Sequence, residues 1–104
     1  MQTYPAKRIE IIIEAPLLRR LTRALDEADV PGYTVMPVRA GSGRSGPWTR
    51  EGQVSKAGGM NAVVLVCSAD RAESVLETAY TVVAEHIGLV NVTDCQVVRP
   101  DRFA

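Results

Sequence analysis

The residues best suited to chemistry are gathered in one stretch, between about residues 39 and 59. Four cations lie in it, Arg39, Arg44, Arg50 and Lys56, against the single acid Glu51, although the whole chain has a formal net charge of zero. Six of the eight glycines share this stretch, at positions 41, 43, 46, 52, 58 and 59. Glycine lets backbone amides turn toward an anion, and the arginine fork matches phosphate or carboxylate. The stretch therefore predicts a binding site for an anionic small molecule.

The hexapeptide Arg39-Ala40-Gly41-Ser42-Gly43-Arg44 combines glycine and arginine most densely. It is not a Walker P-loop, because the spaced glycine followed by Lys and Ser/Thr is absent. It is not a Rossmann fingerprint either, because no helix is expected after it. Composition alone gives about equal weight to a solvated loop with scattered arginines. Trp48, the only tryptophan, either anchors a partner or ligand or packs on the base of this loop.

Groups for catalysis are sparse. His86 is the single histidine, and we expect it late in a helix, where a cationic group interacts well with the helix end. No serine follows a nucleophile-elbow pattern. Cys67 and Cys95 lie in apolar runs and are interpreted as buried free thiols rather than a disulfide. With one histidine they fall short of any zinc-site spacing. The sequence thus predicts no catalytic residue and no metal site, and a sensor rather than an enzyme.

Length and composition set broad limits. A chain of 104 residues, 46% of them hydrophobic, is expected to form one domain over residues 1–104. Zero net charge argues against a nucleic-acid or membrane-surface binder, which needs a broad basic field. The N-terminus shows no signal region, and the apolar runs are too short to cross a bilayer. We expect a cytoplasmic protein that is not embedded in a membrane.

The first half of the chain is predicted to form a strand, a helix and a second strand. Ile9, Ile11 and Ile13 alternate with polar residues and predict a half-buried strand. Pro16 is expected to start a helix that Pro31-Gly32 ends. Its apolar stripe is formed by Leu17, Leu18, Leu21, Leu25 and Ala28. Residues 33–39 are predicted to form the second strand, which leads into the long glycine-rich loop.

The second half repeats this order. Residues 60–68 have an uninterrupted apolar centre, which predicts a middle strand of the sheet. Asp70 and Glu73 have the spacing of a helix cap, and Gly88 suits a left-handed helix stop. Residues 90–99 are predicted to form the last strand. Two βαβ-like halves of this kind favour an α+β fold, the ferredoxin-like βαββαβ sandwich with both helices on one face. Apolar residues on both faces of the strands imply an oligomer, because a lone chain would expose an apolar patch.

At Gly32-Tyr33-Thr34-Val35-Met36, directly before the long loop, the chain resembles the PII signal-transduction superfamily. It is most similar to the PII-like proteins that accompany bicarbonate transport and carboxysomes. The resemblance extends in element order from about Lys7 to Arg99. It implies a homotrimer with inward-facing sheets, adenine nucleotides in the clefts between subunits, and a long loop (the T-loop) that changes shape to engage a partner.

The resemblance also implies roles for individual positions. Gly32 and Thr34 match residues beside the adenine. The base pocket would be lined by Ile12, Val64, Leu65 and Val66. The phosphates would be met at the foot of the T-loop by Arg39, Gly41, Ser42, Gly43 and Arg44. Gly88 and Leu89 match the short loop after the second helix (the B-loop), and Arg99 matches an arginine near the phosphate end.

Departures from the family pattern refine the expectation. PII proteins bind a triphosphate with a longer B-loop that contains glycine and lysine. In this chain only residues 86–90 occupy the place of that loop. The resemblance therefore implies that ADP or AMP suits the chain better than ATP. The tyrosine modified at the tip of their T-loop is absent, and the chain ends soon after Arg102-Phe103 without a cysteine-bearing tail. It therefore looks like the carboxysome-associated branch, which implies bicarbonate beside the nucleotide, with Arg44 or Lys56 as its cation.

The leading hypothesis is a trimeric PII-like regulator that binds ADP or AMP, with bicarbonate as a candidate co-ligand. Its T-loop would switch to act on a protein target, such as a bicarbonate transporter, and so regulate inorganic-carbon uptake or carboxysome function. Two alternatives remain open. One is a small hydrolase on the same scaffold, and the other is a trimeric metal-tolerance protein, which would need His, Cys or carboxylate ligands at the cleft.

Overall fold

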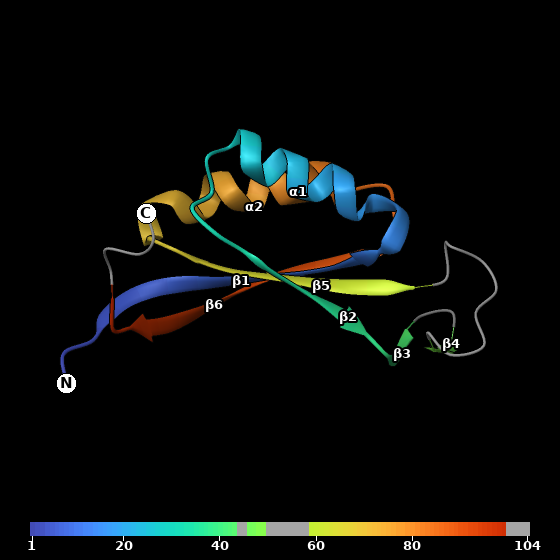
Figure 1. Ribbon diagram of the computed structural model, residues 1–104, viewed down its shortest axis with the longest axis horizontal. Helices are drawn as coiled ribbons and strands as arrows, with labels where there is room; N and C mark the ends of the chain where they lie inside the picture. The colour runs from blue at the N-terminus through green and yellow to red at the C-terminus, as the bar shows by residue number, and fades with distance from the viewer. Residues whose placement is uncertain (44–45, 50–58, 100–104) are drawn as a thin grey trace.

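The computed structural model describes residues 1–43, 46–49 and 59–99. A four-stranded antiparallel sheet has the strand order β2-β5-β1-β6. Helices α1 and α2 both cover one face of this sheet (Figure 1). The elements of this α+β sandwich, in chain order, are β1 (Tyr4–Glu14), a 3₁₀ turn (Ala15–Leu17), α1 (Leu18–Glu27), β2 (Thr34–Val38), β3 (Ala40–Gly43), β4 (Gly46–Thr49), β5 (Met60–Cys67), α2 (Ala69–Val83) and β6 (Gly88–Val97). The predicted ferredoxin-like arrangement is confirmed.

The core lies between the sheet and the helices. Ile9, Ile11 and Ile13 of β1 are fully buried, as their alternation predicts. The helices meet them with a stripe at helical spacing, which includes Leu21, Leu25, Val75 and Ala79. β5 lies between β2 and β1, so the prediction of a middle strand is also confirmed.

The ends of α1 differ from the prediction. Pro16 lies in the 3₁₀ turn that precedes the helix rather than in the helix itself. The helix ends at Glu27, and Asp29 takes a left-handed backbone conformation with φ 57°. Nη2 of Arg71, on α2, donates to the carbonyl of Ala28 at 2.8 Å. The chain therefore stops the helix with a turn that α2 secures, several residues before Pro31-Gly32.

The ends of α2 also differ. The extended cap residue is Ser68, with φ −68° and ψ 156°, and Asp70 lies inside the first turn. The cap prediction was wrong because the chain leaves the sheet at once after β5 ends at Cys67. The helix ends at Val83, and Gly88 is not its left-handed stop but the first residue of β6, paired with Ile13.

The long loop contains a hairpin that the sequence did not predict. β3 and β4 pair antiparallel, with Ala40 opposite Thr49 and Gly43 opposite Gly46. β3 is Ala-Gly-Ser-Gly and β4 is Gly-Pro-Trp-Thr, and neither alternates apolar with polar residues, so no strand periodicity marks them. The expected role of the Trp48 side chain, and residues Arg44 and Lys56, lie outside the described part of the structure.

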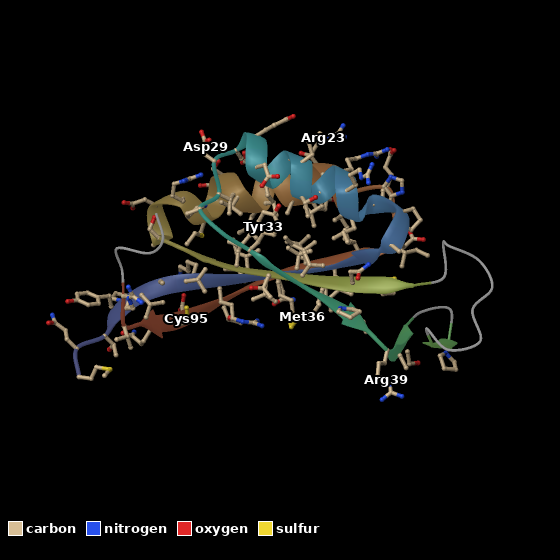
Figure 2. All side chains as sticks on the ribbon, viewed as in Figure 1. Arg23, Asp29, Tyr33, Met36, Arg39 and Cys95 are labelled. Atoms are coloured by element: carbon tan, nitrogen blue, oxygen red, sulfur yellow. The ribbon has the colours of Figure 1, made fainter. Side chains whose placement is uncertain are left out.

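The sheet face away from the helices carries an apolar row across all four strands. The register places Met36, Ala62, Ile12 and Leu89 side by side. Met36 is 41% exposed and Leu89 55% exposed, and Met36 projects away from the helices (Figure 2). A row of this kind is what the expected oligomer would cover.

Both cysteines are free, as predicted, but only Cys67 is buried; the prediction that Cys95 is buried was wrong, because it lies partly exposed on the edge strand β6. Cys67 pairs with Lys7 and Cys95 with Ala6, which are neighbours on β1 and so point to opposite faces of the sheet. β1 separates the two cysteines, which rules out a disulfide between them. Burial raises the pKa of the Cys67 thiol. None of the helices in the described ranges is both long and apolar enough to cross a bilayer.

Candidate functional site: a cavity at the start of β2

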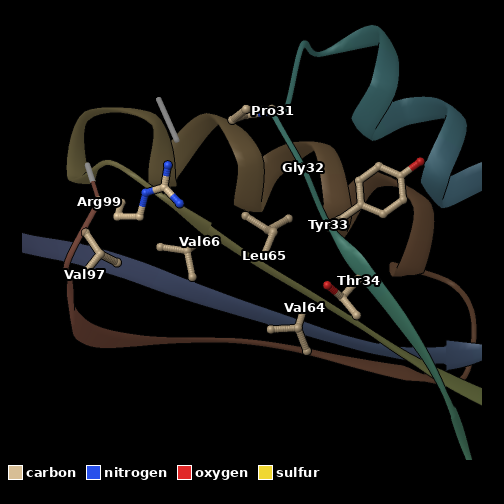
Figure 3. A pocket seen from close by; sticks show the side chains of 9 residues that line it. All are labelled: Pro31, Gly32, Tyr33, Thr34, Val64, Leu65, Val66, Val97 and Arg99. Atoms are coloured by element: carbon tan, nitrogen blue, oxygen red, sulfur yellow. The ribbon is translucent and has the colours of Figure 1, made fainter. Parts of the chain in front are cut away.

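A cavity of about 520 Å³ opens where β2 begins. Thr34 and Val64 form the first pair of the β2·β5 ladder, while β5 continues to Cys67 beside β1. The outer edge of β5 beyond Val64 therefore faces the cavity instead of a strand (Figure 3). The lining residues are Pro31, Gly32, Tyr33, Thr34, Val64, Leu65, Val66, Val97 and Arg99.

The lining suits a flat apolar group with a polar or anionic attachment. Aliphatic side chains from β5 and Val97 of β6 form its walls, and the Thr34 hydroxyl and the Arg99 guanidinium are its polar groups. Apolar walls with a few placed polar groups are the usual composition of a small-molecule site. The open edge of β5 adds backbone donors and acceptors, which a heteroaromatic base can use.

The roof of the cavity is fixed by the turn between α1 and β2. Arg71 holds the Ala28 carbonyl and also reaches the carbonyl of Asp29 at 3.4 Å. Beyond Pro31, the Tyr33 hydroxyl donates to Oδ1 of Asp26 at 3.0 Å, which ties the start of β2 back to α1. This hydrogen bond, with a smaller contribution from burial, raises the pKa of Tyr33 above its ordinary value. Hydrogen bonds within the chain therefore hold the roof in place without a ligand.

Six of the residues predicted from the sequence line this cavity: Gly32, Thr34, Val64, Leu65, Val66 and Arg99. Sequence reasoning missed Pro31, Tyr33 and Val97. Pro31 and Tyr33 flank Gly32 directly, and Val97 lies two residues before Arg99, so it shares a side with it in an extended chain. Adjacency and strand alternation were the signals that could have found them.

A second group of predicted residues lies at the opposite edge of the sheet. Gly88 pairs with Ile13 and Leu89 with Ile12, on the edge strand β6. Val97, at the other end of β6, lines the cavity, and Gly88 precedes it by nine residues, about 30 Å along the strand, so one chain does not bring Gly88 and Leu89 to the cavity. Gly88 has a local reason to be glycine, because an added Cβ would lie 2.7 Å from Cγ1 of Val83 and 2.8 Å from the carbonyl oxygen of Ile12.

A third group, Arg39, Gly41, Ser42 and Gly43, lies beyond the other end of β2, at the foot of the long loop. Figure 2 shows Arg39 there, facing away from the helices. Arg39 follows Thr34 by five residues, about 17 Å along a strand. Arg99 shares the cavity with Thr34, so Arg39 and Arg99 flank opposite ends of β2 and cannot meet the same phosphate within one chain.

Comparison with known proteins gives a consistent result, although no curated protein matches the chain. The structure of CPII from Thiomonas intermedia K12, a nitrogen regulatory PII-like protein bound to ADP, AMP and bicarbonate, is similar with a TM-score of 0.86. It is 29% identical, over 98% of this chain and 96% of CPII. CPII bound to ADP and bicarbonate is 31% identical, with a TM-score of 0.82 over 99% and 98% of the two chains.

A protein from Thermus thermophilus that is described as PII-like shares the fold, with a TM-score of 0.81, 24% identity and full coverage of both chains. The family model "Nitrogen regulatory protein P-II" matches residues 6–102, which is nearly the whole chain. The cavity at the start of β2, the sheet order and the long loop after β2 thus all occur in a chain that belongs to the nitrogen regulatory protein P-II family.

Proposed function

We propose that this chain is a PII-like regulatory protein that binds ADP or AMP in clefts between the subunits of a homotrimer. Bicarbonate is its co-ligand, and the long loop changes shape in response, so that the protein regulates inorganic-carbon uptake or carboxysome function. The loop would act on a protein target such as a bicarbonate transporter. Signalling is the role of the P-II family, and the finer assignment is supported by the cavity and by the similarity to CPII.

The observation that carries the proposal is the cavity beside the open edge of β5. Its aliphatic walls suit an adenine, and the Thr34 hydroxyl and the exposed backbone offer hydrogen bonds to the base. CPII, similar over nearly the full length, was solved with ADP, AMP and bicarbonate bound. Both findings favour an adenine nucleotide as the anionic ligand of this chain.

The predicted site residues lie at two different edges of the sheet, and this favours a cleft between copies of the chain. Gly88 and Leu89 lie on the β6 edge, and the cavity and Arg39 lie on the β2 edge. A neighbouring copy that presents its β6 edge to the β2 edge of the first would bring the groups together. The apolar row that includes Met36 and Leu89 supplies the surface that such an assembly would cover.

In this arrangement the base lies against β5 at Thr34, and the phosphates extend along β2 toward Arg39 and the glycines of β3. Glycine amides and arginine then neutralise the phosphate charge. Residues 41–43 of the loop foot take one conformation with ligand bound, and Arg44 or Lys56 is the proposed cation for bicarbonate. The signal is the difference in ligand affinity between loop conformations.

Calorimetry tests this proposal directly. ADP is titrated into the purified protein with and without bicarbonate at fixed pH and ionic strength, and chloride at equal concentration is the control. Coupled ligands should change each other's affinity by about 5–150-fold. Equal ADP affinity with bicarbonate and with chloride would remove bicarbonate as a co-ligand, and no ADP binding at all would refute the nucleotide site.

A further inference from the structure

Glu14, the last residue of β1, holds the short loop that follows α2. The backbone N–H of Ile87 donates to Oε1 of Glu14 at 3.2 Å. Ile87 comes directly before Gly88, the first residue of β6, which pairs with Ile13. The carboxylate therefore continues the contact between β1 and β6 by one side-chain hydrogen bond.

The register places this carboxylate at a junction of three segments. Glu14 is opposite Met60, the first residue of β5, and Met60 is opposite Val38, the last residue of β2. The next amide, of Ala15, donates to the carbonyl of Gly59 at 2.8 Å, where the long loop returns. Glu14 thus lies at the same end of the sheet as the loop foot, and in the proposed assembly Glu14 and Ile87 of a neighbouring copy reach the phosphate end of the cleft together with Gly88 and Leu89 of that copy.

The charge of Glu14 has no cationic partner in the described ranges. The ion pairs there are Lys7 with Asp94 and Arg8 with Glu10. Glu14 is only half-buried, so its charge is screened but still acts on a ligand close by. It is a fixed negative group at the place where a longer phosphate chain would arrive.

Backbone N–H groups of loops are natural phosphate donors, and each offers a single hydrogen. Here the Ile87 N–H already donates to the Glu14 carboxylate, so it is not free to donate to a phosphate oxygen. A ligand phosphate at this amide must displace Glu14 and also approach its charge. The repulsion grows with the charge and reach of the phosphate chain, so it falls most heavily on a triphosphate.

We propose that Glu14 is a specificity-determining residue that selects a nucleoside monophosphate or diphosphate over the triphosphate, by occupying the Ile87 amide with a fixed carboxylate. The proposal rests on the nucleotide site proposed above and gives that site its discrimination among phosphate chain lengths.

The test is the variant Glu14→Gln, in which the side-chain oxygen still accepts from Ile87 but the charge is gone. The ratio of ATP to ADP affinity, measured by calorimetry without magnesium, should rise by about tenfold. The matched control is Glu10→Gln, on the same strand and face but about 13 Å along it. Glu10 carries the same charge and accepts from Nδ2 of Asn91 at 3.3 Å, yet its removal should leave the ratio unchanged.

If Glu14→Gln lowers the stability of the protein, a second variant still tests whether ATP reaches the Ile87 amide. In Glu14→Ala the Ile87 amide is left open, so adding ATP should shift the Ile87 amide resonance in a ¹⁵N–¹H spectrum more than adding ADP does. An unchanged ATP-to-ADP ratio in Glu14→Gln, in protein that still binds ADP, would overturn the role of Glu14 alone. A wild-type protein that binds no adenine nucleotide would overturn the nucleotide site and this role with it.

Discussion

At the scale of single residues, the structure fixes the cavity roof through hydrogen bonds to the end of α1 and to the turn that follows it. The Tyr33 hydroxyl donates to Asp26, and Arg71 secures the carbonyls that follow α1. Because the phenol is neutral while it donates to a carboxylate, its folded-state pKa is raised. This small stabilisation is present below pH 10.0, the ordinary value for tyrosine, and is lost as the pH rises through the folded-state pKa.

Replacing Asp26 by Ala should therefore lower the pKa of Tyr33 toward 10.0, because the accepting carboxylate and its charge are both removed. Titration of the tyrosine ring carbons by NMR measures it. Glu27→Ala, the neighbouring acid at the end of α1, is the control and should leave the titration of Tyr33 in place. A Tyr33 pKa that stays raised in Asp26→Ala would contradict this account of the roof.

At the scale of elements, hydrophobic periodicity predicted what buries apolar area. The alternation of Ile9, Ile11 and Ile13 and the apolar run within residues 60–68 predicted two strands, and the order of two βαβ-like halves placed both helices on one face. Helix ends and the β3–β4 hairpin were not predictable in this way. The start of α2 depends on where the preceding strand ends, which puts the cap residue at Ser68. The hairpin depends on pairing between two segments that have no periodic pattern of apolar residues.

For the candidate site too, the sequence located the local residues but not the relations that depend on the fold. The pentapeptide at residues 32–36 and the apolar run of β5 located most of the cavity lining. The sequence could not show that Gly88 and Leu89 lie at the opposite sheet edge, or that Arg99 shares the cavity with Thr34 rather than with Arg39. Those relations follow from strand order, which is a property of the folded chain.

Substituting two glycines by alanine distinguishes the cost of a steric clash from the effect of losing glycine's backbone freedom. Gly88→Ala should lower the free energy of unfolding by about 1–3 kcal/mol, since the new methyl would press on Val83 and on the Ile12 carbonyl. Gly32→Ala is the matched control, because a Cβ there meets nothing within 4 Å. Urea unfolding of both variants measures the difference, and equal stabilities would show that the close approach at Gly88 is relieved by movement of the chain.

At the scale of the whole molecule, the exposed apolar row across the sheet bears on assembly. Met36→Lys places a charge in that row, and it should reduce the mass in solution from about three times 11.3 kDa to that of one chain. Tyr80→Lys, on α2, replaces a large side chain that is more exposed than Met36 and lies on the helix side of the molecule, and it should leave the mass unchanged. Light scattering with size separation measures both, and an unchanged mass for Met36→Lys would show that the row is not an assembly surface.

The central claim is that an adenine nucleotide binds at a boundary between copies of this chain, and one titration tests it most directly. ADP is added to the wild-type protein and to folded Met36→Lys, and the dissociation constant and the stoichiometry are measured for each. One ADP per chain for the wild type, with affinity at least about tenfold weaker in the dissociated variant, is the predicted result, since part of the site then comes from a neighbour. ADP bound with equal affinity by a single chain, or not bound by the assembled protein at all, would contradict the claim.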